Sequence, residues 1–255
     1  MAKAIFMLVL SLTLLSCSGG RQHLSAHEIL PRKGYVFIKK TVILKKIAKK
    51  KIEKGKMTSV GSGFVIKLTH KGAFIMTAAH VCVTSKEDLL PNVEAYDVLK
   101  VETLDGRWFN TRIIKVNHVI DACMIFAEDL VSGIEEVPLS DEAPKEGDKV
   151  YNIASPYGIH YKNVVPIFEG RYFGSSGFKS FYTFNAAPGS SGSMILNSKG
   201  ELIGLLHSVY RDMYSLVVGV NYHALIQFIK NSLIEHASEH MKELREYNRY
   251  TLHKY

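Results

Sequence analysis

A serine lies between two glycines just before a short apolar run, an arrangement that can present a hydroxyl nucleophile. The stretch is Gly189-Ser190-Ser191-Gly192, and the apolar run begins at Met194. Glycine permits the backbone angles and close approaches that such a tight turn requires. The same turn can direct the backbone N–H groups of Gly189 and Ser191 at one point, where they would stabilise an oxyanion. Gly/Ser loops are common, so the turn alone is a weak indication of catalysis.

Two upstream stretches supply the partners that a serine nucleophile needs. His80 follows the small residues Thr77-Ala78-Ala79, and Asp121 opens the apolar run 122–126. A serine hydroxyl reacts at neutral pH only with a base within hydrogen-bond reach and an acid that orients this base. The chain order His80, Asp121, Ser191 differs from that of α/β-hydrolases and of subtilisins. The alternative is three unrelated structural residues, which requires all three contexts to be coincidental.

These stretches together resemble the catalytic motifs of trypsin-like serine peptidases, most closely those of the HtrA-type bacterial branch. The likeness is carried by the strings T-A-A-H, D-A-C-M and G-S-S-G-S. Gly61-Ser62-Gly63 and Ser155-Pro156-Tyr157-Gly158 are similar to further segments of that branch, and the resemblance extends over about 36–228. Many relatives continue into a PDZ domain, for which the roughly 25 residues after Lys230 are too few.

The resemblance implies an all-β fold of two six-stranded antiparallel barrels (chymotrypsin-like) with a C-terminal helix. His80 and Asp121 would belong to the first barrel and Ser191 to the second, with the active site in the cleft between them. The implied activity is that of a serine endopeptidase that hydrolyses protein or peptide substrates through an acyl-enzyme, without a cofactor. The alternative is a catalytically inactive envelope protein of the same fold that binds peptides.

Composition and turn spacing also predict six strands in each half. The expected strands are 35–44, 58–68, 72–77, 93–103, 108–117 and 122–126, then 149–154, 163–173, 178–185, 193–196, 202–210 and 214–220. The organisation follows as a signal segment over 1–20, a tether over 21–33, a first barrel over 34–131, a linker over 132–148, a second barrel over 149–221, and a helix with a tail over 222–255.

Two charged stretches need their own interpretation. The segment 45–56 carries seven lysines and is expected to be a solvated hairpin loop, with contact to anionic lipid as the alternative. Within the C-terminal stretch, 222–247 is helical in pattern. Its apolar stripe is formed by Leu225, Phe228, Ile229, Leu233 and Ile234.

The overall charge and a histidine pair could suggest other ligands. The formal net charge is +8, but much of the excess lies in one lysine-rich stretch and no nucleic-acid-binding motif is present, so we expect no nucleic-acid partner. The string H-x-x-E-H at 236–240 is a zinc-peptidase pattern. It lies in a charged terminal helix with no evident third ligand, so we expect a solvated helix and no metal.

The three cysteines cannot form a disulfide framework. Cys82 and Cys123 each lie two residues after a proposed triad member. We expect both to be buried apolar residues. A bridge between them is the less favoured alternative, since the two flanking motifs should converge.

The N-terminal stretch is typical of a secretory signal. Lys3 precedes an apolar run over 4–15 that is short for a membrane span. Leu14-Leu15-Ser16-Cys17 resembles a bacterial lipobox, which implies lipidation of Cys17, and ordinary cleavage near Gly20 is the alternative. We therefore expect an exported protein that is lipid-anchored in the bacterial envelope on the periplasmic side.

The resemblance also locates the pocket for the side chain before the cut. Its floor would come from Asn185, and its walls would include Ala186, His207, Ser208 and Gly219. An uncharged floor would leave a buried lysine or arginine unpaired, which is costly. We therefore expect cleavage after medium apolar residues. If His207 faces the pocket, it would instead favour Glu or Gln.

Overall fold

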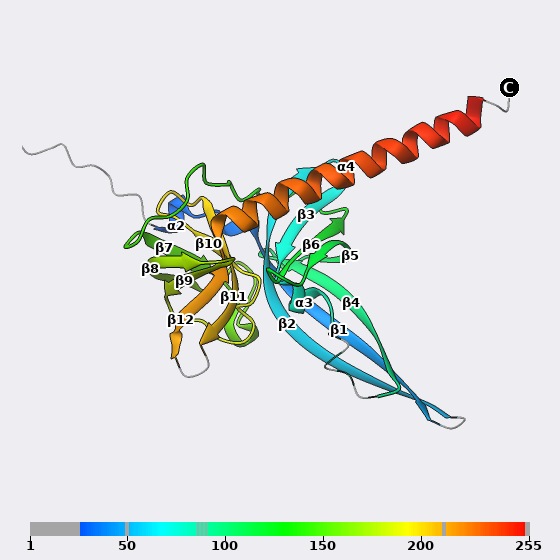
Figure 1. Ribbon diagram of the computed structural model, residues 1–255, viewed down its shortest axis with the longest axis horizontal. Helices are drawn as coiled ribbons and strands as arrows, with labels where there is room; N and C mark the ends of the chain where they lie inside the picture. Colours follow the sequence, from blue (N-terminus) through cyan, green and yellow to red (C-terminus); the bar gives the residue numbers. More distant parts are fainter. Residues whose placement is uncertain are drawn as a thin grey trace, which may run out of the picture.

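The computed structural model describes residues 26–48, 51–85, 87, 89, 91–210 and 213–252 of the 255-residue chain. Its strands form two closed antiparallel barrels of six strands each, which lie side by side and are followed by a long helix (Figure 1). The expected fold class is therefore confirmed. The predicted signal segment over 1–20, with Cys17, lies outside the described residues.

Two strands of the first barrel, β3 and β6, are almost fully buried. All of β3 and all but the last residue of β6 are buried, because both are apolar and the helix that follows the barrels packs against them. The barrel closes in the order β1-β2-β3-β6-β5-β4. Its elements are β1 (Tyr35–Ala48), β2 (Lys51–Thr69), β3 (Gly72–Thr77), the short helix α3 (Ala79–Cys82), β4 (Val93–Thr103), β5 (Trp108–Asn117) and β6 (Ala122–Glu128). Two small elements, α2 (Ala26–Ile29) and the 3-10 turn η2 (Arg32–Gly34), precede it.

The lysine-rich segment forms strand rather than the expected hairpin loop. β1 and β2 pair without a register shift from Tyr35↔Phe64 to Ala48↔Lys51, and residues 49–50 between them are not described. β4 pairs along the other edge of β1 as far as Lys46↔Val93. The prediction of a loop over 45–56 is wrong because the pairing of β1 with β2 and with β4 supplies backbone hydrogen bonds to this segment, and residues 54–56 remain exposed within the strand. The three strands extend from the barrel as an arm (Figure 1).

The second barrel closes in the order β10-β11-β12-β9-β8-β7. Tyr182 and Ile195 lie fully buried in its core. The 3-10 turn η4 (Pro156–Gly158) precedes β8. The strands are β7 (Lys149–Ile153), β8 (Ile167–Ser176), β9 (Lys179–Thr183), β10 (Met194–Leu196), β11 (Leu202–Tyr210) and β12 (Met213–Val220).

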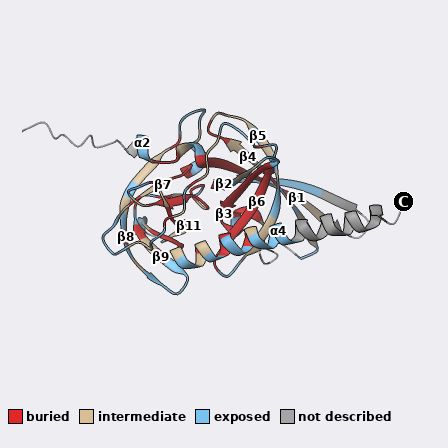
Figure 2. Ribbon diagram, turned by 90° about the horizontal axis from the view of Figure 1, so that it is seen from above, coloured by how far each residue is buried: buried red, intermediate tan, exposed pale blue. Residues whose placement is uncertain are grey.

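The helix α4 (Tyr222–Leu252) contacts both barrels, through β11 of the second and through β5 and β6 of the first. Leu225, Phe228 and Ile229 are buried there, as the predicted stripe requires. Ile234 is 64% exposed, whereas the next two residues, Glu235 and His236, still contact Lys115 and Phe74 of the first barrel. Figure 2 shows burial concentrated in the barrel strands and an exposed outer face on α4. Within the described part of the chain, no helix combines the length and the apolar character that a membrane span needs.

Cys82 and Cys123 form a disulfide, which corrects the expectation of two separate buried thiols. The cysteines end α3 and follow the first residue of β6, and their Cα atoms lie 6.5 Å apart. The bridge thus forms because the two motifs converge. It covalently connects the segments that carry His80 and Asp121.

Candidate active site

His80 is held at two points by the carboxylate of Asp121. His80 Nδ1 lies 2.7 Å from Asp121 Oδ2, and the backbone N–H of His80 donates to Oδ1 at 3.0 Å. The backbone carbonyl of Asp121 also accepts from Ala79 N–H at 3.2 Å. Asp121 has φ +52°, a left-handed conformation that aspartate tolerates better than most residues. This turn before β6 directs both carboxylate oxygens at α3.

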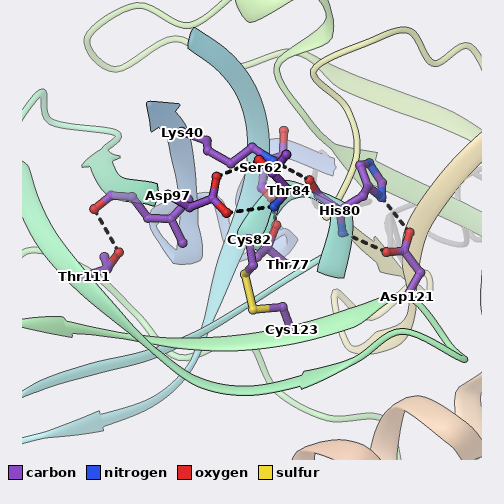
Figure 3. The surroundings of a disulfide bond; sticks show 11 residues. Lys40, Ser62, Thr77, His80, Cys82, Thr84, Asp97, Thr111, Asp121 and Cys123 are labelled. Carbon is purple, nitrogen blue, oxygen red and sulfur yellow. Dashed lines mark hydrogen bonds and ion pairs between the residues drawn. A yellow bond between two sulfur atoms is a disulfide. The ribbon is translucent and has the colours of Figure 1, made fainter. Parts of the chain in front are cut away.

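Two further links keep α3 in place. The Lys40 ammonium, which is almost fully buried, donates to the carbonyl oxygen of His80 at 2.8 Å. The disulfide connects Cys82, the last residue of α3, to Cys123 of β6 (Figure 3). The imidazole of His80 is therefore fixed through its backbone, its Nδ1 atom and the helix that carries it. Sequence reasoning did not identify Lys40, because nothing in a lysine-rich strand distinguishes one lysine from the next.

The Asp121 carboxylate stays ionised over a wide pH range. Burial raises its pKa, but polar contacts with His207 and His80 lower it by more, and the net pKa is well below that of an ordinary aspartate. The side chain of Asp121 is 15% exposed and that of His80 is 52% exposed. A sheltered negative charge thus lies beside the Nδ1 atom of an accessible imidazole.

The turn around Ser191 requires its two glycines. Gly189 has φ +98° and Gly192 has φ +83°, both in the region that favours glycine. A Cβ atom on Gly192 would also overlap Thr77 Oγ1 and lie 2.5 Å from the Ser62 carbonyl oxygen and 2.7 Å from Ala78 N. The turn therefore packs directly against the segment that leads into His80.

The carbonyl groups of this turn are anchored to the scaffold. Pro188 O accepts from Tyr157 N–H at 2.6 Å, Gly189 O accepts from Ser62 Oγ at 2.9 Å, and Ser191 O accepts from Ser62 N–H at 2.9 Å. The C=O and N–H groups of a trans peptide point in opposite directions, so the anchored Pro188 carbonyl directs the N–H of Gly189 away from Tyr157. Within the described residues, the N–H groups of Gly189 and Ser191 have no acceptor.

The Ser191 hydroxyl itself has no hydrogen-bond partner in the described part of the chain. Its residue is half-buried, and its carbonyl lies on the edge of β2. The structure thus brings the backbone of the turn against the first barrel, while the hydroxyl hydrogen-bonds to neither His80 nor any other described side chain.

His207, on the strand β11, lies against Asp121. Its Nδ1 atom is 2.9 Å from Asp121 Oδ2 and buried, although the N–H direction is poorly aligned for a hydrogen bond. The sequence gives no sign of this contact, since the two residues lie on different barrels. The ligand atoms of His80, Asp121 and His207 lie within 4.8 Å of one another and could contact one divalent ion. The 2.7 Å separation of His80 and Asp121 is, however, a hydrogen-bond distance.

The other predicted pocket residues lie in different environments. Asn185 is exposed, Ala186 is buried, and Ser208 is half-buried opposite Val218. Gly219 lies in the second core, where a Cβ atom would be 3.1 Å from side-chain atoms of Ile195 and Tyr182. The preference for medium apolar residues stays a prediction.

Only the first histidine of the C-terminal H-x-x-E-H string has a described side chain. His236 packs edge-on against Phe74, with ring centroids 5.2 Å apart, rather than lying in solvent as expected. The side chains of Glu239 and His240 are not described.

Known proteins resemble this chain in sequence and in fold. Residues 61–205 match the family model of the trypsin-like peptidase domain. A DegP-like periplasmic serine endoprotease of Marinomonas sp. (strain MWYL1) is 28% identical over 162 residues, which cover 62% of this chain and 31% of that protein. The periplasmic serine endoprotease DegP of Salmonella typhimurium is 28% identical over 158 residues, 59% of this chain and 30% of that protein. The chain thus spans about a third of the length of these curated relatives.

A solved structure supports the fold. The crystal structure of the serine endoprotease from Yersinia pestis superposes with a TM-score of 0.57, covering 79% of this chain and 63% of that one at 16% sequence identity. At this identity the likeness concerns the arrangement of the barrels.

Proposed function

Because the chain belongs to the trypsin-like peptidase domain family, we propose that it is a serine endopeptidase with His80, Asp121 and Ser191 as its catalytic triad. The observation that carries the proposal is the two-point attachment of His80 to Asp121, next to a glycine-bounded turn that presents Ser191. The relatives named as serine endoproteases support the same activity. The substrates are protein or peptide chains.

In the proposed mechanism, Ser191 Oγ attacks the scissile carbonyl and His80 Nε2 accepts the hydroxyl proton. Asp121 keeps Nδ1 of His80 protonated and stabilises the imidazolium that forms. The N–H groups of Gly189 and Ser191 donate to the oxyanion, and each such donor contributes about 3–4 kcal/mol in comparable sites. His80 then protonates the leaving amine, and water hydrolyses the acyl-enzyme by the reverse proton transfers.

The free Ser191 hydroxyl is compatible with this mechanism. Catalytic hydrogen bonds often become short and aligned only when substrate is bound. We infer that the hydroxyl turns toward Nε2 of His80 as the substrate carbonyl enters the site.

The preferred residue before the cut is proposed to be Val, Leu, Ala or Met, and a peptide-library digest dominated by Arg or Lys would contradict this.

We propose that the protein is exported and acts in the bacterial envelope. The Marinomonas and Salmonella relatives are named as periplasmic, and a disulfide persists in an oxidising compartment. A lipid on Cys17 would hold the protein at the membrane. Changing Cys17→Ser should release it to the soluble fraction, and its persistence in the membrane fraction would contradict the lipid anchor.

A fluorophosphonate probe tests the activity directly. It should label the purified protein at Ser191, and Ser191→Ala should remove the label. An unchanged intact mass of the protein after incubation with the probe would favour the alternative of an inactive peptide-binding protein. No feature of the described fold favours that alternative over the enzyme.

A further inference from the structure

The arm carries an apolar pocket of about 370 Å³ on one face. Its apolar lining comes from Val42 and Leu44 of β1, Met57 of β2, Leu89, and Val93 of β4. We refer to this as the arm pocket. We infer that the arm pocket binds an apolar side chain of the substrate segment that follows the scissile bond. This inference rests on the proposed endopeptidase function.

The strand register places the apolar residues on a common face. Val42 lies opposite Met57 in the β1–β2 pair, and Leu44 lies opposite Gly55, which adds no side chain to the wall. Val42 is 7% exposed at the base, whereas Met57 is 62% exposed at the rim. A methionine side chain is flexible and polarisable, so it can adapt to different apolar partners. These properties suit a pocket that accepts aliphatic side chains of varied shape.

The arm pocket is continuous with the catalytic centre along two elements. Lys40, which lines it, donates to the His80 carbonyl at 2.8 Å. Ser59, which also lines it, precedes Gly61 by two residues, and a Cβ atom on Gly61 would lie 3.3 Å from the carbonyl oxygen of Ser191. A chain that leaves the nucleophile along β2 therefore passes directly onto the pocket.

The edge of β2 offers a path for that chain. On its outer side β2 pairs with β3 only from Phe64 onward, so the preceding edge has no partner strand in the described part of the chain. Ser62 N–H, on this same edge, already binds Ser191 O at 2.9 Å. An extended peptide can add to a free strand edge through backbone hydrogen bonds, with side-chain pockets that supply specificity.

The position of the arm indicates which part of the substrate it meets. The residues predicted for the pocket before the cut, such as Asn185, belong to the second barrel, and the arm belongs to the first. A substrate that crosses Ser191 therefore reaches the arm after the cut. Gly61 and Met57 are four residues apart, about 13 Å along a strand, so an extended substrate would place its third or fourth residue after the cut in the pocket.

Two substrate types test this inference in the full-length protein. The first is a peptide p-nitroanilide, which has no amino acid after the cut. The second is a set of internally quenched peptides with the same residues before the cut and either Leu or Gly at the third and fourth positions after it. We expect Leu to raise kcat/KM about tenfold or more over Gly. Met57→Asp and Leu44→Asp should abolish this preference and leave anilide hydrolysis unchanged.

Ile43 provides the matched control. It is the neighbour of Val42 and Leu44 on β1, points to the opposite face, and is 37% exposed. Ile43→Asp should change neither the Leu preference nor anilide hydrolysis. Should the Leu44 variant fail to fold, the Met57 variant decides, because its side chain is already mostly in water.

Each contrary result has a distinct meaning. No hydrolysis of the anilide by the unmodified protein would contradict the proposed function itself. Anilide hydrolysis with equal rates for the Leu and Gly peptides would overturn the arm pocket as a substrate site. A Met57→Asp variant that keeps the Leu preference but has a changed oligomeric mass would make the pocket a contact between copies, and would also overturn the inference.

Discussion

His207 Nδ1 lies 2.9 Å from Oδ2 of Asp121, the same oxygen that His80 Nδ1 approaches at 2.7 Å. Two imidazoles from different barrels therefore meet one carboxylate oxygen. The contact joins β11 of the second barrel to Asp121 of the first, and it gives Asp121 a second imidazole partner besides His80. A displacement of His207 should be transmitted to the base through this shared oxygen.

We predict that His207→Ala lowers kcat about tenfold to a hundredfold, because small misplacements of catalytic groups have large effects on rate. His207→Asn should recover part of the loss, since its amide nitrogen can occupy the position of Nδ1. The pH dependence of kcat should also shift in the alanine variant, which a purely structural role would not cause. Full activity with an unchanged pH profile in His207→Ala would contradict a positioning role.

The proposed triad should act as a unit. Ser191→Ala and His80→Ala should each reduce peptide hydrolysis by several orders of magnitude, and the double variant should be little worse than either. Ser198→Ala, at an exposed serine after β10, serves as the control and should retain full activity. Retention of a few per cent of activity in either single variant would contradict the assignment.

The disulfide should contribute to both stability and activity. Its cysteines are 41 residues apart, and closing a loop of this length stabilises a fold by about 3–4 kcal/mol in the chain-entropy description. The double variant Cys82→Ala/Cys123→Ala should lower the free energy of unfolding by about this amount in urea titrations. Because the bridge holds α3 next to β6, kcat should fall as well. A reducing agent should lower the stability of the wild-type protein but not that of the double variant.

The lowered pKa of Asp121 predicts a specific pH dependence of stability. An aspartate in an unfolded chain has a pKa of about 3.9. The stabilisation from ionised Asp121 is therefore present above about pH 4 and is lost as the pH falls toward the lower pKa of the folded state. Asp121→Asn should lower the free energy of unfolding by about 1–3 kcal/mol at pH 7.

Urea titrations over a range of pH check this prediction. The difference between wild type and Asp121→Asn should narrow as the pH decreases below about 4. The exposed Asp129 is the control, and Asp129→Asn should show a small difference at every pH. A difference for Asp121→Asn that widens in acid would contradict the role given to the carboxylate.

Much of the fold could be predicted from the sequence because strand alternation and turn residues are local signals. The limits of β3, β4 and β5 agree with the predicted strands over 72–77, 93–103 and 108–117. The loop predicted at 45–56 is wrong because lysine content indicates solvent contact, and a strand in a thin arm has solvent contact as well. Local composition cannot reveal that β4 continues along β1.

The site shows the same division between local and long-range information. The glycines around Ser191 are visible as a motif, and their positive φ angles are the local reason for it. The Cys82–Cys123 bridge and the His207–Asp121 contact depend on distances between segments far apart in the chain. Such distances follow from how the barrels close and meet, and no single stretch of sequence encodes them.

Gly192 provides the sharpest test of how the two barrels meet. Gly192→Ala would add the cost of a non-glycine residue at φ +83° and an overlap with Thr77 Oγ1, so the turn could no longer pack against the His80 segment. Gly177 is the matched control, because it has φ +56° and a Cβ atom added there would meet no described atom within 4 Å. We expect Gly177→Ala to cost about 1–2 kcal/mol of stability with full activity.

Gly192→Ala should therefore cost clearly more stability than Gly177→Ala and should remove most peptide hydrolysis. The difference between the two variants isolates the packing contact from the backbone penalty, since both place a methyl group on a residue with positive φ. Urea titrations and kcat measurements on the pair decide the matter. Equal losses of stability with activity preserved in both would show that the close approach of the Ser191 turn to the first barrel is not needed for the active arrangement.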